Sequence, residues 1–85
     1  MYFVYILQNP KGQLYVDFTI NLNSRIARHN SEDGAEYTSR NKNFILAYKE
    51  ECKTLLQARR REKQIKGWRK EKKLNLIKFG KPTLD

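Results

Sequence analysis

The stretch "YFVYILQNPKGQLYVDFT", residues 2–19, decides the fold at the start of the chain. Two runs rich in aromatic and β-branched residues, 2–7 and 14–19, favour strands. Between them "NPKG", residues 9–12, has Asn, Pro and Gly at the first, second and fourth positions of a type I turn. The stretch therefore predicts a β-hairpin.

The register of this hairpin decides whether Tyr5 and Tyr15 lie on one face of the sheet. A four-residue turn would pair Ile6 with Tyr15 and leave Tyr5 on the opposite face, because side chains alternate along a strand. An odd-length loop or a bulge would instead bring Tyr5 opposite Tyr15 on one face. A site that uses both tyrosines requires the odd register.

A short helix and a third strand are expected next. Asn21 can cap a helix that reaches about Asn30, with Leu22 and Ile26 as its apolar stripe. The segment "FILAYKE", residues 44–50, predicts the strand.

Two helices are expected at the end of the chain. Thr54 with Gln57 three residues later forms a capping box, so a helix begins at residue 54 or 55. Gly67 ends or bends this helix, and Trp68, interpreted as a core anchor, begins another that reaches about Ile77.

The order β-β-α-β-α-α predicts an α+β fold, with a small three-stranded antiparallel sheet flanked by helices. We expect one domain over residues 1–78 and an irregular tail over residues 79–85. No apolar run approaches the length of a membrane span, and the start of the chain lacks the features of a signal peptide, so we expect a cytoplasmic protein. A single cysteine and a single histidine exclude an internal disulfide and a Cys/His zinc site.

The positive charge is concentrated in one segment. The chain has a net charge of +9, and residues 57–73 hold nine Lys and Arg against two Glu, a net of +7. Such a segment attracts polyanions, most simply nucleic acid, although a solvated helical face is the plainer interpretation. It lacks the wide apolar face of a membrane-surface helix. The cations that we assign to nucleic-acid binding are Arg25, Arg28, Arg40, Lys63, Lys66, Arg69, Lys70 and Lys73.

One acidic residue lies in an apolar stripe. Leu55, Ala58, Glu62 and Ile65 share one face of the expected helix. A carboxylate there is costly unless it is paired, protonated or bound to a metal. Glu62 either lies at the edge of the stripe, bonded to Arg25 or an exposed lysine, or binds a hard divalent cation that a phosphate completes.

Arg25 and His29 share a face of the first helix, at spacing i, i+4. Arginine suits bidentate phosphate binding, and a nearby histidine can donate to phosphate or relay a proton. The plainer interpretation of both residues is a solvated helix surface.

Together these segments resemble the GIY-YIG nuclease family. "VYIL" (residues 4–7) and "YVD" (15–17) resemble its paired motif, and "TINLNSRIARHN" (19–30) its first helix. "AEYTSRNKNFILAYKE" (35–50) resembles its loop and third strand, and "QARRREKQIKGWRKEKKLNLI" (57–77) its Glu-bearing helix with the segment after that helix. The resemblance is to the small stand-alone, single-domain bacterial members.

The resemblance implies divalent-metal-dependent hydrolysis of nucleic-acid phosphodiesters, with DNA as the first expectation. It makes Tyr5 the general base or part of the relay that deprotonates water, and it gives Tyr15 the positioning of water or phosphate. Arg25 would stabilise charge on the phosphate, and His29 would support the relay. Glu62 would hold one Mg²⁺ or Mn²⁺ ion.

The chain departs from the family pattern at Asp17, where the second motif ends in Gly. Either Asp17 turns away or helps Glu62 coordinate the metal, or its charge repels phosphate and leaves a nucleic-acid-binding module with weakened catalysis. Asn75 is a loose positional candidate for an asparagine that serves some members. Substrate structure, sequence preference and oligomeric state stay open.

Overall fold

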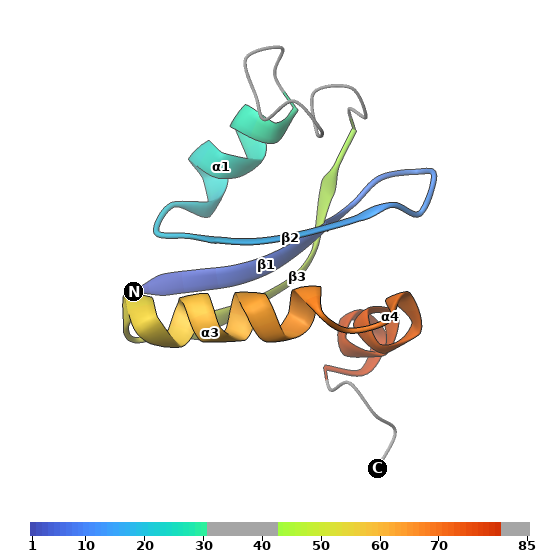
Figure 1. The fold of residues 1–85 in the computed structure, drawn as a ribbon. Helices are drawn as coiled ribbons and strands as arrows, with labels where there is room; N and C mark the ends of the chain where they lie inside the picture. The colour runs from blue at the N-terminus through green and yellow to red at the C-terminus, as the bar shows by residue number, and fades with distance from the viewer. Residues whose placement is uncertain (31–42, 81–85) are drawn as a thin grey trace.

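The computed structural model of the chain describes residues 1–30 and 43–80. Its antiparallel sheet has the order β2-β1-β3, formed by β1 (Tyr2–Gln8), β2 (Leu14–Thr19) and β3 (Ile45–Cys52). The helices are α1 (Leu22–His29), α3 (Leu55–Lys66) and α4 (Lys70–Phe79). The predicted α+β fold and its element order are confirmed (Figure 1). No helix in the described ranges is both long enough and apolar enough to cross a membrane.

The hairpin between β1 and β2 has a three-residue loop, residues 10–12. The Gly12 N–H donates to the Asn9 carbonyl at 2.9 Å, which closes the predicted turn, and the Asn9 N–H donates to the Gln13 carbonyl at 3.2 Å. Gly12 has φ +81°, so the connection is a turn followed by a left-handed residue. The Asn9 side chain also accepts from the backbone N–H groups of Lys11 and Gln13. The loop is therefore of odd length.

The odd loop places Tyr5 and Tyr15 on one face of the sheet, as a shared site requires. Tyr5 is opposite Asp17, and Tyr15 is opposite Leu7. The expectation of a common face is confirmed, but direct pairing of the two tyrosines is wrong. They are diagonal neighbours, still within reach of aromatic side chains.

Both faces of the sheet are covered by helices. Figure 1 shows α1 on one side of the sheet and α3 and α4 on the other. The core on the α3 side consists of Val4, Ile6, Val16, Ala58, Ile65 and Leu76. The core on the α1 side consists of Tyr5, Leu7 and Phe44, against which Tyr15, Leu22 and Ile26 pack. The middle strand β1 is thus buried on both faces, which explains its continuous apolar run.

The helix starts follow the predicted caps. The Asn21 side chain accepts from the Ser24 N–H at 3.1 Å, and α1 begins at the next residue. The Thr54 hydroxyl accepts from the Gln57 N–H at 3.1 Å, and α3 begins at residue 55. The Gln57 side chain reaches back to the Lys53 N–H at 3.0 Å rather than to Thr54.

The last helix lies later in the chain than predicted. Its predicted start at Trp68 is wrong, because the Trp68 N–H donates to the Ile65 carbonyl and so belongs to the end of α3. The helix passes Ile77 and ends before Gly80, which has φ +75°. The side chain of Trp68 packs against the core, as expected of an anchor.

The loop conformation can be tested with Gly12→Ala. An L-residue at φ +81° is strained, so we expect a loss of about 1 kcal/mol in the free energy of unfolding. Gly67→Ala is the matched control, because Gly67 has φ −76° and its added Cβ would meet only ordinary contacts. Urea denaturation measures both, and equal effects of the two substitutions would contradict this account of the turn.

Candidate active site

Tyr5 and His29 form a buried pair between the sheet and α1. The Tyr5 hydroxyl lies 3.0 Å from His29 Nε2, and the two residues are 0% and 2% exposed. Burial, followed by the negative charge of Asp17, raises the pKa of the Tyr5 phenol. Burial lowers the pKa of the His29 imidazole. Both groups are therefore uncharged at neutral pH, and with the His29 proton on Nδ1 the Tyr5 hydroxyl donates to Nε2.

Tyr15 lies against the same histidine. The rings of Tyr15 and His29 meet edge-on, with centroids 4.6 Å apart. The Tyr15 hydroxyl donates to Asp17 Oδ2 at 3.3 Å. Burial and the Asp17 carboxylate raise the pKa of the Tyr15 phenol, so it too keeps its proton at neutral pH.

Asp17 points into this cluster. The Arg25 guanidinium donates to Asp17 Oδ2 at 3.3 Å, and the Phe18 N–H donates to Oδ1 at 2.8 Å. The interpretation that Asp17 turns away is therefore wrong. The Asp17 carboxylate is therefore already bound to the Arg25 guanidinium, where a phosphate would be expected to bind.

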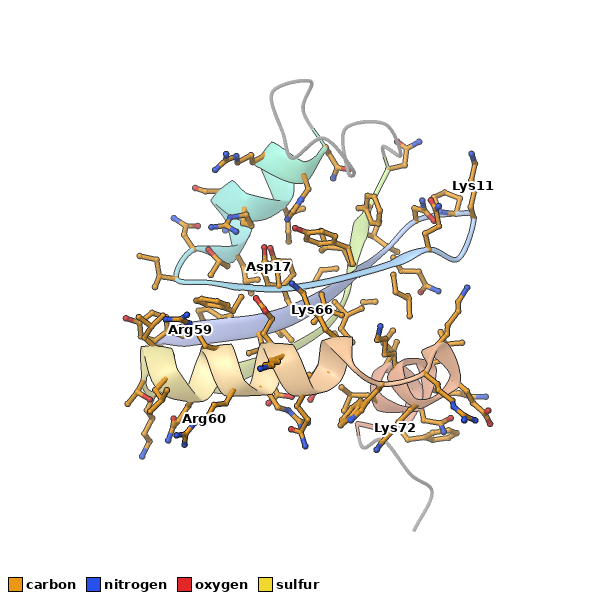
Figure 2. All side chains as sticks on the ribbon, in the orientation of Figure 1. Lys11, Asp17, Arg59, Arg60, Lys66 and Lys72 are labelled. Atoms are coloured by element: carbon orange, nitrogen blue, oxygen red, sulfur yellow. The ribbon has the colours of Figure 1, made fainter. Side chains whose placement is uncertain are left out.

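Glu62 joins the cluster from the other side of the sheet, past the edge strand β2. Its helix neighbours Ala58 and Ile65 are buried against the sheet, whereas the Glu62 side chain is 17% exposed. Lys66 Nζ lies 3.4 Å from Glu62 Oε1, so the partner is a lysine, one of the two expected alternatives, and not Arg25. Figure 2 shows Lys66 extending from α3 toward β2.

The two carboxyl groups of the cluster influence each other. Burial, and then interaction with Asp17, raises the pKa of the Glu62 carboxyl, while the Lys66 ammonium opposes this shift. The interaction between Glu62 and Asp17 places Glu62 near Tyr15 and Arg25, which both donate hydrogen bonds to Asp17. The five residues assigned to catalysis from the sequence therefore lie around one point at the β2 edge.

The comparisons with known proteins identify the family of the chain. A family model described as the GIY-YIG catalytic domain matches residues 1–75. The chain belongs to the GIY-YIG family. UPF0213 proteins from the Staphylococcus aureus strains Mu3, Mu50 and N315 are each 39% identical to it over 77 residues, which is 91% of this chain and 94% of theirs.

A solved structure supports the same assignment. The solution NMR structure of the UPF0213 protein BH0048 from Bacillus halodurans is 32% identical, with a TM-score of 0.58. The match covers 91% of this chain and 83% of that one. The chain is therefore similar to small GIY-YIG proteins along most of its length, and its family implies a nuclease-like function.

GIY-YIG nucleases generally use divalent metal ions, so the donor set has to fit one. Mg²⁺ binds through one or two carboxylates, several waters and substrate phosphate oxygens. Glu62 with Asp17 supplies such carboxylates, and a bound cation would oppose the effects of burial and of Asp17 that raise the pKa of Glu62. In residues 1–30 and 43–80, no group of three or more His, Cys, Asp or Glu is placed to hold a metal. The site therefore fits an ion that depends on substrate for part of its coordination.

The remaining predicted residues are dispersed. Asn75 lies on α4 and lines a hollow of about 360 Å³ with Trp68 and Lys72, which none of the five clustered residues lines. Of the basic residues that we assigned to nucleic-acid binding, Arg40 lies outside the described residues. The exposed ones are Arg28, Lys63, Lys66, Arg69 and Lys70, while Lys73 and Arg25 are half-buried.

Sequence reasoning missed the pairing of Asp17 with Arg25. A signal was present, because Gly at the fourth position of "NPKG" is the residue that turns a type I turn into a three-residue hairpin loop. The resulting register puts Asp17 on the face of Tyr5 and Tyr15, where α1 also packs.

The buried neutral histidine predicts a pH dependence of stability. The pKa of His29 is lower in the folded than in the unfolded chain, where it is about 6.5. As the pH falls below this value, the unfolded chain binds the proton more readily, so the free energy of unfolding decreases. We expect His29→Gln to remove this part of the decrease between pH 8 and pH 5, measured by urea denaturation. An unchanged pH profile in the variant would contradict the buried neutral state.

Proposed function

We propose that this protein is a divalent-metal-dependent endonuclease that hydrolyses phosphodiester bonds of nucleic acid, with DNA as its substrate. One observation carries the proposal, namely the convergence of five chemically suitable side chains at the β2 edge. They come from four elements and are Tyr5, Tyr15, Arg25, His29 and Glu62.

Arg25 would bind the scissile phosphate. Its guanidinium already holds the Asp17 carboxylate, so the surroundings of Arg25 accept an anion. Guanidinium matches phosphate as well as carboxylate, and phosphoryl transfer depends mainly on positioning and charge stabilisation. Arg25 therefore stabilises negative charge on the phosphate once substrate has replaced Asp17.

The Tyr5–His29 pair supports a proton relay. Because burial raises the pKa of Tyr5, the phenolate is scarce at neutral pH and Tyr5 is a poor base by itself. The neutral imidazole of His29 lies within hydrogen-bond distance. As Tyr5 takes a proton from the attacking water, its own proton passes to Nε2, and the relay leaves one positive charge on His29.

Glu62, with Asp17 beside it, would hold the metal ion. A bound divalent ion neutralises charge on the phosphate and lowers the pKa of a coordinated water. In the resting site the ammonium of Lys66 balances Glu62. Lys66 is long and half-exposed, so it can move to the phosphate when the ion is bound.

The role of Glu62 can be tested with Glu62→Ala. We expect cleavage of oligonucleotides in Mg²⁺ or Mn²⁺ to fall by about 100-fold or more, while binding in EDTA persists. Glu51→Ala is the control, because Glu51 is an exposed carboxylate on β3 and should leave cleavage unchanged. Retained cleavage in Glu62→Ala would exclude Glu62 as the metal ligand.

The alternative function is a nucleic-acid-binding module with weakened catalysis. It is favoured by the position of Asp17, whose carboxylate accepts hydrogen bonds from both Arg25 and the Tyr15 hydroxyl. A phosphate that approaches Arg25 meets this negative charge and has to displace it. Besides burial, the same carboxylate raises the pKa values of both tyrosines, so less phenolate is available at neutral pH to accept a proton.

Asp17→Asn and Asp17→Gly distinguish these possibilities. If Asp17 restrains the site, both variants bind phosphodiester substrate about tenfold more tightly and cleave it faster, because Arg25 is released. If Asp17 is a metal ligand with Glu62, both variants lose cleavage as Glu62→Ala does, and they bind Mn²⁺ more weakly in calorimetry. Two variants are needed because glycine inside a strand costs stability by itself.

A further inference from the structure

A groove leads away from the candidate active site, between β2 and α3. It has a volume of about 470 Å³ and is lined by Phe18, Leu56, Arg59, Arg60, Glu62 and Lys63. Glu62 belongs to both the groove and the catalytic cluster, so the two are continuous. Figure 2 shows Arg59 projecting from α3 toward the sheet.

The cations of this groove differ from their neighbours in having no carboxylate partner among residues 1–30 and 43–80. Arg25 pairs with Asp17, and Lys66 pairs with Glu62. Arg61, on the same helix, pairs with Glu50. Within the described part of the chain, no salt bridge joins Arg59, Arg60 or Lys63 to an acidic side chain.

This arrangement is unfavourable unless an anion binds. Arg59 and Lys63 are exposed and spaced i, i+4, where like charges destabilise a helix by about 0.2–0.5 kcal/mol. Together with Lys66 they span eight residues, 59–66, which is about 10 Å of helix axis. A row of cations of that length can contact more than one phosphate of a single strand. The row therefore suits a polynucleotide strand that runs along α3.

The groove also has an apolar wall. Leu56 is 56% exposed, and Phe18 is half-buried at the β2 edge. Binding of a duplex backbone needs only the cations, since paired bases are stacked inside the helix. An exposed apolar wall beside phosphate-binding cations instead suits a base that has left the stack.

We propose that this groove binds one unpaired nucleotide of the cleaved strand, next to the scissile phosphate. Arg59 and Lys63 hold its phosphates, and Phe18 with Leu56 packs against its base. The proposal rests on the nuclease function proposed above and names its substrate class, a nucleic acid with an unpaired stretch at the cleavage site.

Binding measurements in EDTA test the groove without any cleavage. Fluorescence anisotropy compares a labelled single-stranded oligonucleotide with a duplex of the same sequence. We expect wild type to bind the single strand more tightly. In the double variant Arg59→Gln/Lys63→Gln, single-strand affinity should fall at least about tenfold, and the slope of log K against log salt should decrease by about 1.4. Lys53→Gln/Lys78→Gln removes two exposed cations elsewhere and should have a much smaller effect.

The apolar wall has its own variants. Phe18→Leu should weaken single-strand binding about fivefold or more without changing the salt slope, and Phe18→Tyr should restore it. Leu56→Ala is a second test, because an exposed leucine can be truncated with little effect on folding. Thermal unfolding by circular dichroism verifies that each variant is folded.

Three results would overturn the inference. The first is that the two double variants lower single-strand affinity equally. The second is that the Phe18 and Leu56 variants lower the affinities for single strand and duplex equally. The third is that the protein binds an acidic peptide such as polyglutamate more tightly than any oligonucleotide. Failure of the nuclease function has a different signature. In that case wild type cleaves no substrate in Mg²⁺ or Mn²⁺, yet the groove variants still lose single-strand affinity in EDTA.

Discussion

The candidate site depends on one hairpin loop having an odd number of residues. A three-residue loop that ends in a left-handed Gly12 sets the register of β1 against β2. That register puts Tyr5, Tyr15 and Asp17 on the face that α1 covers. A shift by one residue would send one set of these side chains to the opposite face. The register that this loop sets thus determines whether these side chains share a face.

The second constraint is the position of the site at an edge of the sheet. β2 has a neighbour on one side only, so side chains from both helical layers can meet around it. His29 and Arg25 arrive from α1 on one face, and Glu62 arrives from α3 on the other. A middle strand such as β1 would separate these layers. The same edge leaves the groove beside α3 open to a ligand.

The sequence predicts those parts of the structure that depend on interactions between residues close together in the chain. The caps at Asn21 and Thr54 are side-chain bonds to backbone groups three residues away, so their residue types identify the helix starts. The start of α4 was misplaced because the Trp68 N–H continues the bonding of α3, which is decided by how the chain leaves Gly67. Within residues 1–30 and 43–80, the existence and type of each helix and strand were nevertheless predicted correctly.

The site was predicted as a set of residues but not as a set of contacts. Helical spacing singled out Glu62, Arg25 and His29, and the family resemblance supplied the catalytic roles. Spacing could not choose between Arg25 and a lysine as the partner of Glu62. That choice is a tertiary one, because Asp17 takes Arg25 and leaves Glu62 to Lys66. Asp17, where the chain departs from the family pattern, is therefore the charge partner of Arg25 in this site.

The resting site consequently balances its own charges. Two carboxylates, Asp17 and Glu62, face two cations, Arg25 and Lys66, and each cation satisfies one carboxylate. If the proposed function holds, ligand binding in such a site would be an exchange, in which a phosphate would replace Asp17 at Arg25 and a metal ion would replace Lys66 at Glu62. The released Asp17 carboxylate and Lys66 ammonium would have opposite charges, and each would favour the incoming ligand of opposite sign. Asp17 would then attract the metal, and Lys66 the phosphate, so the two binding events would reinforce each other. On this account Asp17 weakens the binding of phosphate alone, but it strengthens the binding of phosphate and metal together.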